Sequence, residues 1–393
     1  MLLPLLAALA APAQARDCPS HVGNHTVAVT DTLAVGAEAR LIGVGVAPSE
    51  GLLEAQREPW DHEAMAGLRG LVEWYPSDLF GAVLEGEVRY RTGGWQENTI
   101  PGLDPFRANQ AFLELYTGAL ETRVGLQHVS FGSTALLDSR MMGARLELGT
   151  RPIAFSLFGG AVLREMLRSG DGCLWYHYQA DRIAWKSLSN EMGDNVLVGG
   201  TFQGKRRGVR LRGLYLLSLS RNEDVAGQGA SLSIAAPLAG SALGLTVEPL
   251  AWKNGEEPWT PGAMAVLRWR VWDAKDAVQL RVGTALALPS ADATAPRPVY
   301  ENLSWGALRR YSLHDERLGM MDAVWPVHGW VEPQLAWYLQ SDGAALSDEL
   351  DLGALWTVGG KHTVKTSAVL LDLAGEAPAS PGVHLEFRGV IGD

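Results

Sequence analysis

The chain has 393 residues, of which 47% are hydrophobic and 20% are charged, and it contains 14 tryptophans but only 2 cysteines. The low charge and the many bulky residues argue against a disordered chain, and two cysteines are too few for a disulfide-stapled scaffold. The formal net charge of −11 argues against a general nucleic-acid binder, because such a protein presents an excess of Lys and Arg to phosphates. A chain of this length can form two or three domains or one large β-barrel.

The first fifteen residues are predicted to be a signal peptide. Leu2 to Ala11 form a short apolar stretch, and Ala13-Gln14-Ala15 matches an A-x-A cleavage site. The alternative is a buried N-terminal helix. We therefore expect an exported protein, with residues 16–32 as an N-terminal periplasmic segment and residues 33–393 as the main domain. Cys18 and Cys173 could pair in an oxidising compartment.

Alternation of apolar and polar residues dominates the rest of the chain. In residues 80–91, Leu84 and Tyr90 face one way, and Glu85 and Glu87 face the other. Residues 209–220 and 278–286 repeat this pattern. A period of two is typical of strands with one apolar face. No run of 18 or more apolar residues follows the predicted signal peptide, so no transmembrane helix is expected.

A soluble β-sandwich and a membrane barrel would both show this alternation, and three features favour the barrel. The predicted strands are long, roughly 10 to 13 residues, against about 5 to 6 residues in soluble sheets. Tight turns alternate with longer loops, as in outer-membrane barrels. Aromatic residues also gather near the predicted strand ends, where rings settle at membrane–water interfaces. These residues are Trp74, Tyr75, Trp252, Trp272, Trp325 and Trp356.

We therefore predict an all-β fold, a closed transmembrane antiparallel β-barrel over residues 33–393 with about eighteen strands, sixteen being the alternative count. An even number places both ends of the barrel in the periplasm. The loops near 47–63, 93–109, 165–194 and 289–314 would then be extracellular. The predicted strands are 33–46, 64–75, 79–92, 110–118, 120–131, 139–149, 153–164, 195–205, 208–220, 228–238, 241–252, 262–273, 276–288, 315–325, 329–340, 347–358, 361–373 and 382–391.

Three segments resemble the alginate-export family of outer-membrane barrels. Residues 121–132, Glu-Thr-Arg-Val-Gly-Leu-Gln-His-Val-Ser-Phe-Gly, are similar to that family's "RVGRQ-x-x-x-YG" strand. Residues 136–146 look like its "LL…R…(D)GARL" strand, and residues 348–352 look like its "G-x-E-x-D" strand. The resemblance implies a monomeric eighteen-stranded channel that passes anionic polysaccharide or other small solutes. The chain has Leu126 where the family motif has a second Arg, and it ends in Gly392-Asp393 rather than Phe.

If the apolar face of each strand meets lipid, the alternate positions line a pore. Over the whole barrel, basic and acidic residues balance at these positions. Between residues 205 and 285, however, five arginines stand against only Glu248, which predicts a wall that attracts anions. The alternative is that these arginines pair across strands and brace the barrel. The candidate pore-lining residues are Arg210, Arg212, Arg268, Arg270, Arg281, Arg123, Arg145, Glu85, Glu87 and Glu121.

Two loops carry aromatic or basic residues that could narrow the pore or pack over its mouth. Residues 165–194 include Trp175, Tyr176 and Trp185, and residues 289–314 include Arg309 and Arg310. The sequence leaves these two arrangements open.

No catalytic, metal or cofactor site is expected. His128 and Ser130 face the same way on one predicted strand, but side chains at i and i+2 stand about 6 to 7 Å apart, too far for a direct hydrogen bond. The histidines show no H-x-x-x-H spacing, and no C-x-x-C motif is present. Such a pattern does not support an enzyme.

The sequence thus predicts an outer-membrane channel, a passive pore for small or anionic solutes. A non-transporting structural or adhesive barrel is the alternative, and a barrel enzyme is a distant third. The expected partners are outer-membrane lipid, lipopolysaccharide and a small or anionic solute, with no nucleic acid. The chain is expected to be a monomer.

Overall fold

The computed structural model describes the strands and tight turns of the chain. The described residues are 26–46, 62–92, 102–131, 137–150, 152–163, 192–220, 227–239, 242–254, 258–271, 278–287, 317–327, 329–341, 346–371, 373–374 and 379–391. No helix in these ranges is long and apolar enough to cross a membrane. The predicted signal peptide, Cys18, Cys173, Trp272 and most of the two long loops lie outside them.

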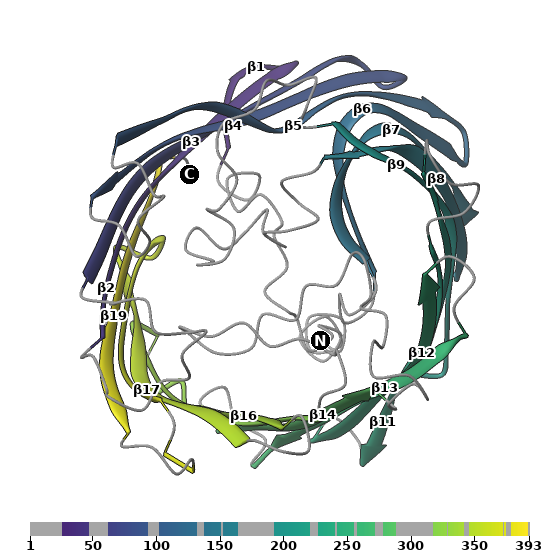
Figure 1. Cartoon of the computed structure of the whole chain (residues 1–393). Coiled ribbons are helices and arrows are strands. Elements are labelled where there is room, and N and C mark those ends of the chain that lie inside the picture. Colours follow the sequence, from purple (N-terminus) through teal and green to yellow (C-terminus); the bar gives the residue numbers. More distant parts are fainter. Residues whose placement is uncertain are drawn as a thin grey trace.

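Eighteen antiparallel strands, β2 to β19, pair in sequence order and close into a ring (Figure 1). The ring closes where the last strand pairs with β2, from Gly382 opposite Val46 to Ile391 opposite Ala37. The predicted closed all-β barrel and its eighteen strands are confirmed, including the strand expected at 315–325. The strands are β2 Leu33–Val46, β3 His62–Ser77, β4 Phe80–Thr92, β5 Gly102–Thr117, β6 Leu120–Phe131, β7 Leu137–Thr150, β8 Ile153–Leu163, β9 Met192–Arg206, β10 Val209–Ser220, β11 Gly227–Ala239, β12 Leu243–Asn254, β13 Thr260–Arg270, β14 Gln279–Ala287, β15 Arg317–Val324, β16 Val331–Ser341, β17 Leu346–Val358, β18 His362–Leu371 and β19 Ser380–Ile391.

A short additional strand, β1 (Val27–Thr30), lies in the segment that was expected to precede the barrel. It pairs with residues 33–35 of β2. Along this stretch β3 pairs with one edge of β2. On the other edge, the pairing with β19 ends at Ala37, and β1 pairs with the residues that precede it. The strand therefore prolongs the sheet past the end of β19 at the closing seam.

Tight turns join the strands at one end of the barrel. Gly118 in the turn between β5 and β6 has a φ of 63°, and Gly359 and Gly360 between β17 and β18 have φ values of 61° and 78°. Turns with positive φ match the right-handed twist of the flanking strands. Leu33 of β2 and Ile391 of β19 lie at the same end. In bacterial barrels this short-turn end faces the periplasm, and the end with the longer loops is extracellular.

The outward-facing positions form an apolar surface around the barrel. Leu157 on β8 and Leu352 on β17 are 62% and 63% exposed, and Leu211 on β10 is also an exposed outward residue. Such a surface is stable when hydrocarbon surrounds it, which agrees with a barrel of the bacterial outer membrane.

Aromatic rings flank this apolar surface at the short-turn end. Trp74 packs edge-on against Phe80 with ring centroids 5.9 Å apart, and Trp330 lies 5.7 Å from Trp356. The interpretation of Trp252 as an interfacial residue was wrong. Its side chain is only 2% exposed and lies on the inner wall, because it shares the inward face of β12 with Glu248 and Leu250.

Several rings pack over glycines on the neighbouring strand. On the outer face, the Phe202 ring of β9 covers Gly213 of β10, so that a Cβ atom at residue 213 would collide with it. On the inner face, the Phe158 ring of β8 covers Gly199 of β9 in the same way. Glycine in a strand marks such close approaches, and the ring compensates for the missing side chain.

Candidate functional site: the inner wall

All ten predicted pore-lining residues occupy inward-facing positions of their strands. They are Arg123, Arg145, Arg210, Arg212, Arg268, Arg270, Arg281, Glu85, Glu87 and Glu121, and the positions beside them carry exposed outward residues such as Leu84, Val124, Leu146, Val209, Trp269 and Val282. The strand alternation therefore placed each of these side chains on the correct face. Which of them meet was not predicted, and the structure brings seven of them into three groups.

The first group, the seam cluster, crosses the closing seam from β19 to β4. Glu38 is fully buried. One of its oxygens forms an ion pair with Arg40 Nε at 2.8 Å, and the other accepts a hydrogen bond from a terminal nitrogen of Arg388 at 2.8 Å. On the next strand pair, Arg69 donates to Glu87 at 3.1 Å and lies 3.4 Å from Glu85. Alternating charges thus tie four neighbouring strands together.

The second group lies at the periplasmic end of β5, β6 and β7. Glu114 accepts hydrogen bonds from Tyr75 at 3.0 Å and Tyr116 at 2.7 Å, and Arg123 Nε lies 2.8 Å from it. Arg123 also donates to Glu121 at 2.7 Å and stacks over the Phe112 ring. Beside it, Arg145 of β7 forms an ion pair with Glu147. Arg123 thus joins β6 to β5, whereas the ion pair of Arg145 lies within β7.

The third group differs because its positive charge exceeds its negative charge. Arg268 on β13 stands directly opposite Arg281 on β14, and Arg281 stands opposite Asp322 on β15. Arg281 Nε donates to Asp322 at 2.8 Å. Two buried nitrogen atoms of Arg268 have no hydrogen-bond partner among the described residues. Two arginines therefore share one carboxylate.

The excess of positive charge extends over one side of the barrel. The described residues from Ile153 to Ala287, here called the basic side, contain nine Lys and Arg but only two carboxylates, Asp194 and Glu248. The described residues of 26–150 contain eight Arg and twelve Asp and Glu. The two sides of the ring thus carry opposite net charge, which creates a transverse field across the interior.

The five arginines of the predicted positive wall fall into two groups on this side. Arg210 and Arg212 lie on β10, whereas Arg268, Arg270 and Arg281 lie on β13 and β14. Strands β11 and β12 separate the groups, so β10 and β13 are about 14 Å apart at the usual strand spacing. Between them, Glu248 of β12 accepts a hydrogen bond from Ser231 at 2.8 Å.

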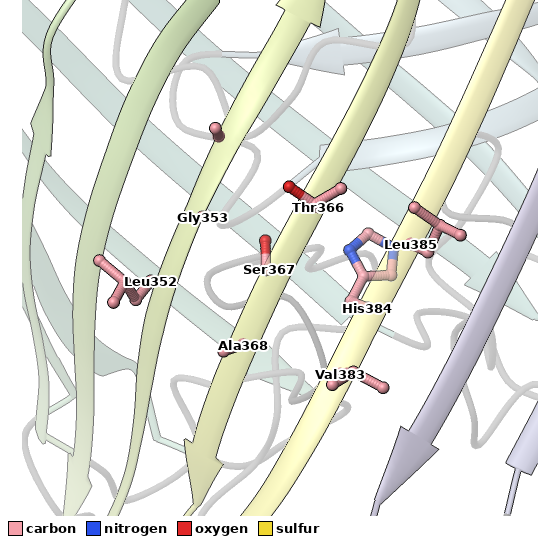
Figure 2. Close-up of a pocket in the computed structure, with 9 residues that line it drawn as sticks. Leu352, Gly353, Thr366, Ser367, Ala368, Val383, His384 and Leu385 are labelled. Carbon is pink, nitrogen blue, oxygen red and sulfur yellow. The ribbon is translucent and has the colours of Figure 1, made fainter.

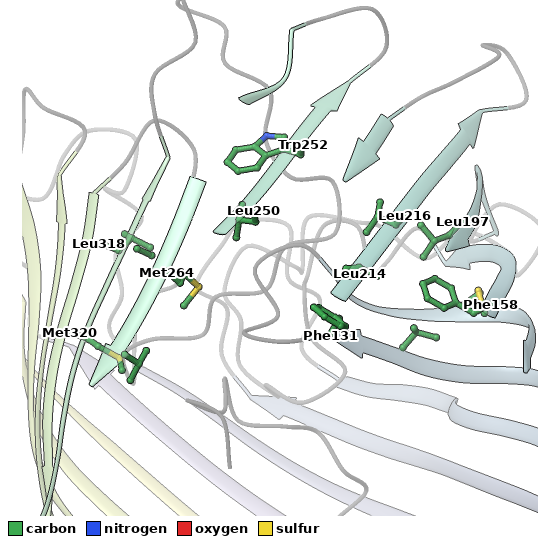
Figure 3. Packing of buried hydrophobic residues seen from close by; sticks show 14 residues of the cluster. Phe131, Phe158, Leu197, Leu214, Leu216, Leu250, Trp252, Met264, Leu318 and Met320 are labelled. Atoms are coloured by element: carbon green, nitrogen blue, oxygen red, sulfur yellow. The ribbon is translucent and has the colours of Figure 1, made fainter. Parts of the chain in front are cut away.

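The extracellular half of the inner wall carries a hydrophobic cluster that was not predicted (Figure 3). The expectation that positions alternating with the lipid face are polar is wrong for this region. Leu214 and Leu216 follow Arg210 and Arg212 on the inward face of β10, and the run 213–217 is apolar on both faces. That run could have predicted the cluster, because a strand that is buried on both faces loses its alternation of apolar and polar residues. The cluster, called the apolar inner cluster, comprises Val129, Phe131, Met141, Phe158, Leu197, Leu214, Leu216, Leu250, Trp252, Met264, Val266, Ala285, Leu318 and Met320.

Charged residues of the inner wall that were absent from the candidates include Glu38, Arg40 and Asp322. Glu38 and Arg40 lie on β2 with the alternation that identified Glu85 and Glu87, so the same pattern could have found them. Asp322 interrupts an apolar strand, Leu-Gly-Met-Met-Asp-Ala-Val, whose pattern gives no reason to single it out.

The outer face holds a pocket of about 400 Å³ on β17, β18 and β19 (Figure 2). Small residues, Ala354, Thr366 and Ala368, form its floor, and Leu352, Val383 and Leu385 rise beside them. These six residues belong to the outward positions of their strands, so the pocket opens away from the lumen.

The polar residues weighed for catalysis do not form a site. His128 belongs to the outward set of β6, together with Val124 and Leu126, so it faces away from the inner wall. No three His, Cys, Asp or Glu side chains gather into a metal-binding group within the described ranges.

Comparisons with known proteins identify the architecture. No family model matches the chain, and no curated protein matches it. Among solved structures it is similar to the outer-membrane porins OccK5 of Pseudomonas aeruginosa (TM-score 0.64, 8% identity, 93% of this chain and 99% of that chain) and OccAB2 of Acinetobacter baumannii (0.63, 9%, 92% and 98%). It is also similar to P. aeruginosa OpdK crystallised with vanillate (0.59, 11%, 92% and 99%). At these identities the likeness shows a porin-like barrel fold.

Proposed function

We propose that the protein is a passive outer-membrane channel that favours small organic anions. The observation that carries this proposal is the inner face of the basic side, where six cations stand against Glu248: Lys205, Arg210, Arg212, Arg268, Arg270 and Arg281. Charged walls of one sign set the selectivity of pores. Arg123 and Arg145 lie outside the basic side, beside carboxylates. The positive field of the basic side comes mainly from Arg210, Arg212, Arg268, Arg270 and Arg281.

The apolar inner cluster supports an organic anion rather than a simple inorganic ion. On β13, Val266 and Met264 follow Arg268 at successive inward positions, and on β15 Met320 follows Asp322. A solute with one anionic group and an apolar body would meet charge and hydrophobic surface side by side. Vanillate, present in the OpdK crystal, is a solute of this chemical class.

The same residues support an exporter of the alginate-export type less well than a channel for small anions. In the motif that resembles that family, Arg123 is held by Glu114 and Glu121, and Leu126 replaces a basic residue. A highly charged polysaccharide would also have to pass the apolar inner cluster. These features favour small solutes over alginate.

A closed structural barrel is the second candidate function. The observation in its favour is the burial of the apolar inner cluster, whose side chains are at most 7% exposed, because an open water-filled lumen would leave them exposed. No residue arrangement among the described strands supports catalysis, and we do not propose an enzyme.

Planar-bilayer recordings of the refolded protein distinguish these functions. We expect conductance with a reversal potential that indicates preference for anions, and a lower anion-to-cation permeability ratio in an Arg268→Ser, Arg270→Ser double variant. Lys361→Ser, in the turn after Gly360, is the control and should leave the ratio unchanged. An unchanged ratio in the double variant would assign these arginines to bracing, and a folded wild type without conductance would favour the closed barrel.

A further inference from the structure

The hairpin between β9 and β10 concentrates positive charge at the periplasmic end. Lys205, Arg206 and Arg207 are consecutive and exposed, and Arg210 stands directly opposite Lys205. The other tight turns described at this end are poor in cations; the turn of β17 and β18 carries only Lys361. No carboxylate lies in the described residues from 195 to 220. The hairpin therefore presents a cationic surface with no neutralising carboxylate in residues 195–220.

Strand alternation divides the three cations on the strands, Lys205, Arg206 and Arg210, between two surfaces. Lys205 continues the inward row of β9, after Leu197 and Thr201, and its partner Arg210 also faces inward. Arg206 continues the outward row after Val198 and Phe202, and it pairs with the outward residue Val209. The lipid-facing row of β9 thus ends in a positive charge, Arg206.

Arg207 occupies the tip of the turn in an unfavourable backbone conformation. Its φ is 50°, and no other described residue except glycine has a positive φ. Gly, Asn and Asp are the usual residues in this conformation, and a bulky side chain costs free energy there. The next residue, Gly208, has a φ of 86°, which glycine adopts without steric cost. Backbone strain of this kind recurs at functional positions.

The surroundings of Arg206, which Arg207 follows at the tip of the turn, are apolar. Ile153 and Phe155 of the adjacent strand β8 are 52% and 55% exposed, and Phe202 and Val209 flank them on the hairpin itself. In a membrane these side chains contact acyl chains, so the adjacent tip lies at the level of the lipid headgroups. Long basic side chains reach from such positions to the interface, and a guanidinium group binds phosphate in a bidentate manner.

We propose that Arg206 and Arg207 form a binding surface for anionic phospholipid headgroups of the periplasmic leaflet. The two guanidinium groups bind the phosphate, and the apolar surface of Phe155, Phe202 and Val209 contacts the acyl chains below it. This surface is separate from the inner wall, and it does not depend on what the barrel transports.

The test uses the full chain refolded in vesicles of phosphatidylethanolamine, with spin-labelled phosphatidylglycerol or phosphatidylcholine as the probe lipid. We expect the wild type to associate with phosphatidylglycerol at least twofold more strongly than with phosphatidylcholine. An Arg206→Gln, Arg207→Asn double variant should lose most of this preference. Asn keeps the backbone conformation at residue 207, because it tolerates positive φ.

Lys205→Gln is the matched control, because it removes one positive charge from the same hairpin on its inward face. This variant should keep the lipid preference of the wild type. A double variant that retains the preference would overturn the proposal, and so would a Lys205→Gln variant that loses as much as the double variant, since net charge alone would then account for the effect. Heat-modifiable gel mobility reports whether each barrel is folded, and the single Arg206→Gln variant replaces the double variant if that one does not fold.

Discussion

Arg268 and Arg281 face each other directly on neighbouring strands, and both side chains lie on the inner wall. Like charges in this arrangement repel and destabilise a sheet. Asp322, next to Arg281 on the other side, compensates only one of the two charges. The positive potential at this place therefore depends on a balance of two arginines and a single carboxylate, and that balance can be changed by one substitution.

Replacing Asp322 with Asn should raise the anion-to-cation permeability ratio. The change removes the one carboxylate that contacts Arg281 in the described part of the chain, so the local positive potential increases. Reversal potentials in asymmetric salt measure the ratio, and Asp322→Glu, which keeps the charge, should restore wild-type behaviour. The lost charge-assisted hydrogen bond should also lower the free energy of unfolding by about 1 to 3 kcal/mol. A ratio that falls or stays constant would contradict the expected role of Asp322.

Glu38→Gln should strongly destabilise the barrel at its seam. Glu38 is fully buried and holds both Arg40 and Arg388, and removing one partner of a buried ion pair typically costs about 3 to 5 kcal/mol. Urea titration of the folded, heat-modifiable form gives the free energy of unfolding. Glu121→Gln is the comparison, since Arg123 retains Glu114 and the pair is partly exposed, and it should cost no more than about 1 kcal/mol. An equal decrease in the free energy of unfolding of the two variants would argue against a special role of the seam.

Leu352→Arg tests the lipid-facing surface at mid-height. Leu352 is the central residue of β17 and points outward, so an arginine there should cost about 2 to 4 kcal/mol. Val358, on the same strand and face but at the periplasmic end, is the matched position, and Val358→Arg should cost about 0 to 1 kcal/mol. The measurement is reversible unfolding from vesicles. Similar costs at both positions would mean that residue 352 does not face the bilayer core.

Gly213→Ala should destabilise the barrel through overpacking. The Phe202 ring lies where the new methyl group would be, and displacing it costs about 1 to 3 kcal/mol. Gly204, two residues after Phe202, has open space beside it, so Gly204→Ala should leave stability nearly unchanged or slightly raised. Thermal unfolding of the two variants, followed by gel mobility, compares them. The explanation by ring packing fails if Gly204→Ala is the more harmful change.

Where apolar and charged residues alternate, the sequence alone determined which face of a strand meets lipid and which faces inward. Alternation is local, because successive side chains of a strand point to opposite faces, and residues such as Leu84 and Glu85 show it without any knowledge of their neighbours. For the same reason the number of strands and the inward position of the candidate arginines could be predicted. The basic character of residues 205–285 also followed from counting the inward residues.

Only the tertiary structure decided which inward residues meet. Arg388 reaches Glu38 although 350 positions separate them, because the ring closes between the last strand and β2. The pairing of Arg268 with Arg281, rather than with a carboxylate, follows from the register of β13 and β14, which alternation does not specify. The apolar inner cluster, with Leu214 and Leu216, likewise depends on the inward faces of several strands gathering on one side of a closed barrel.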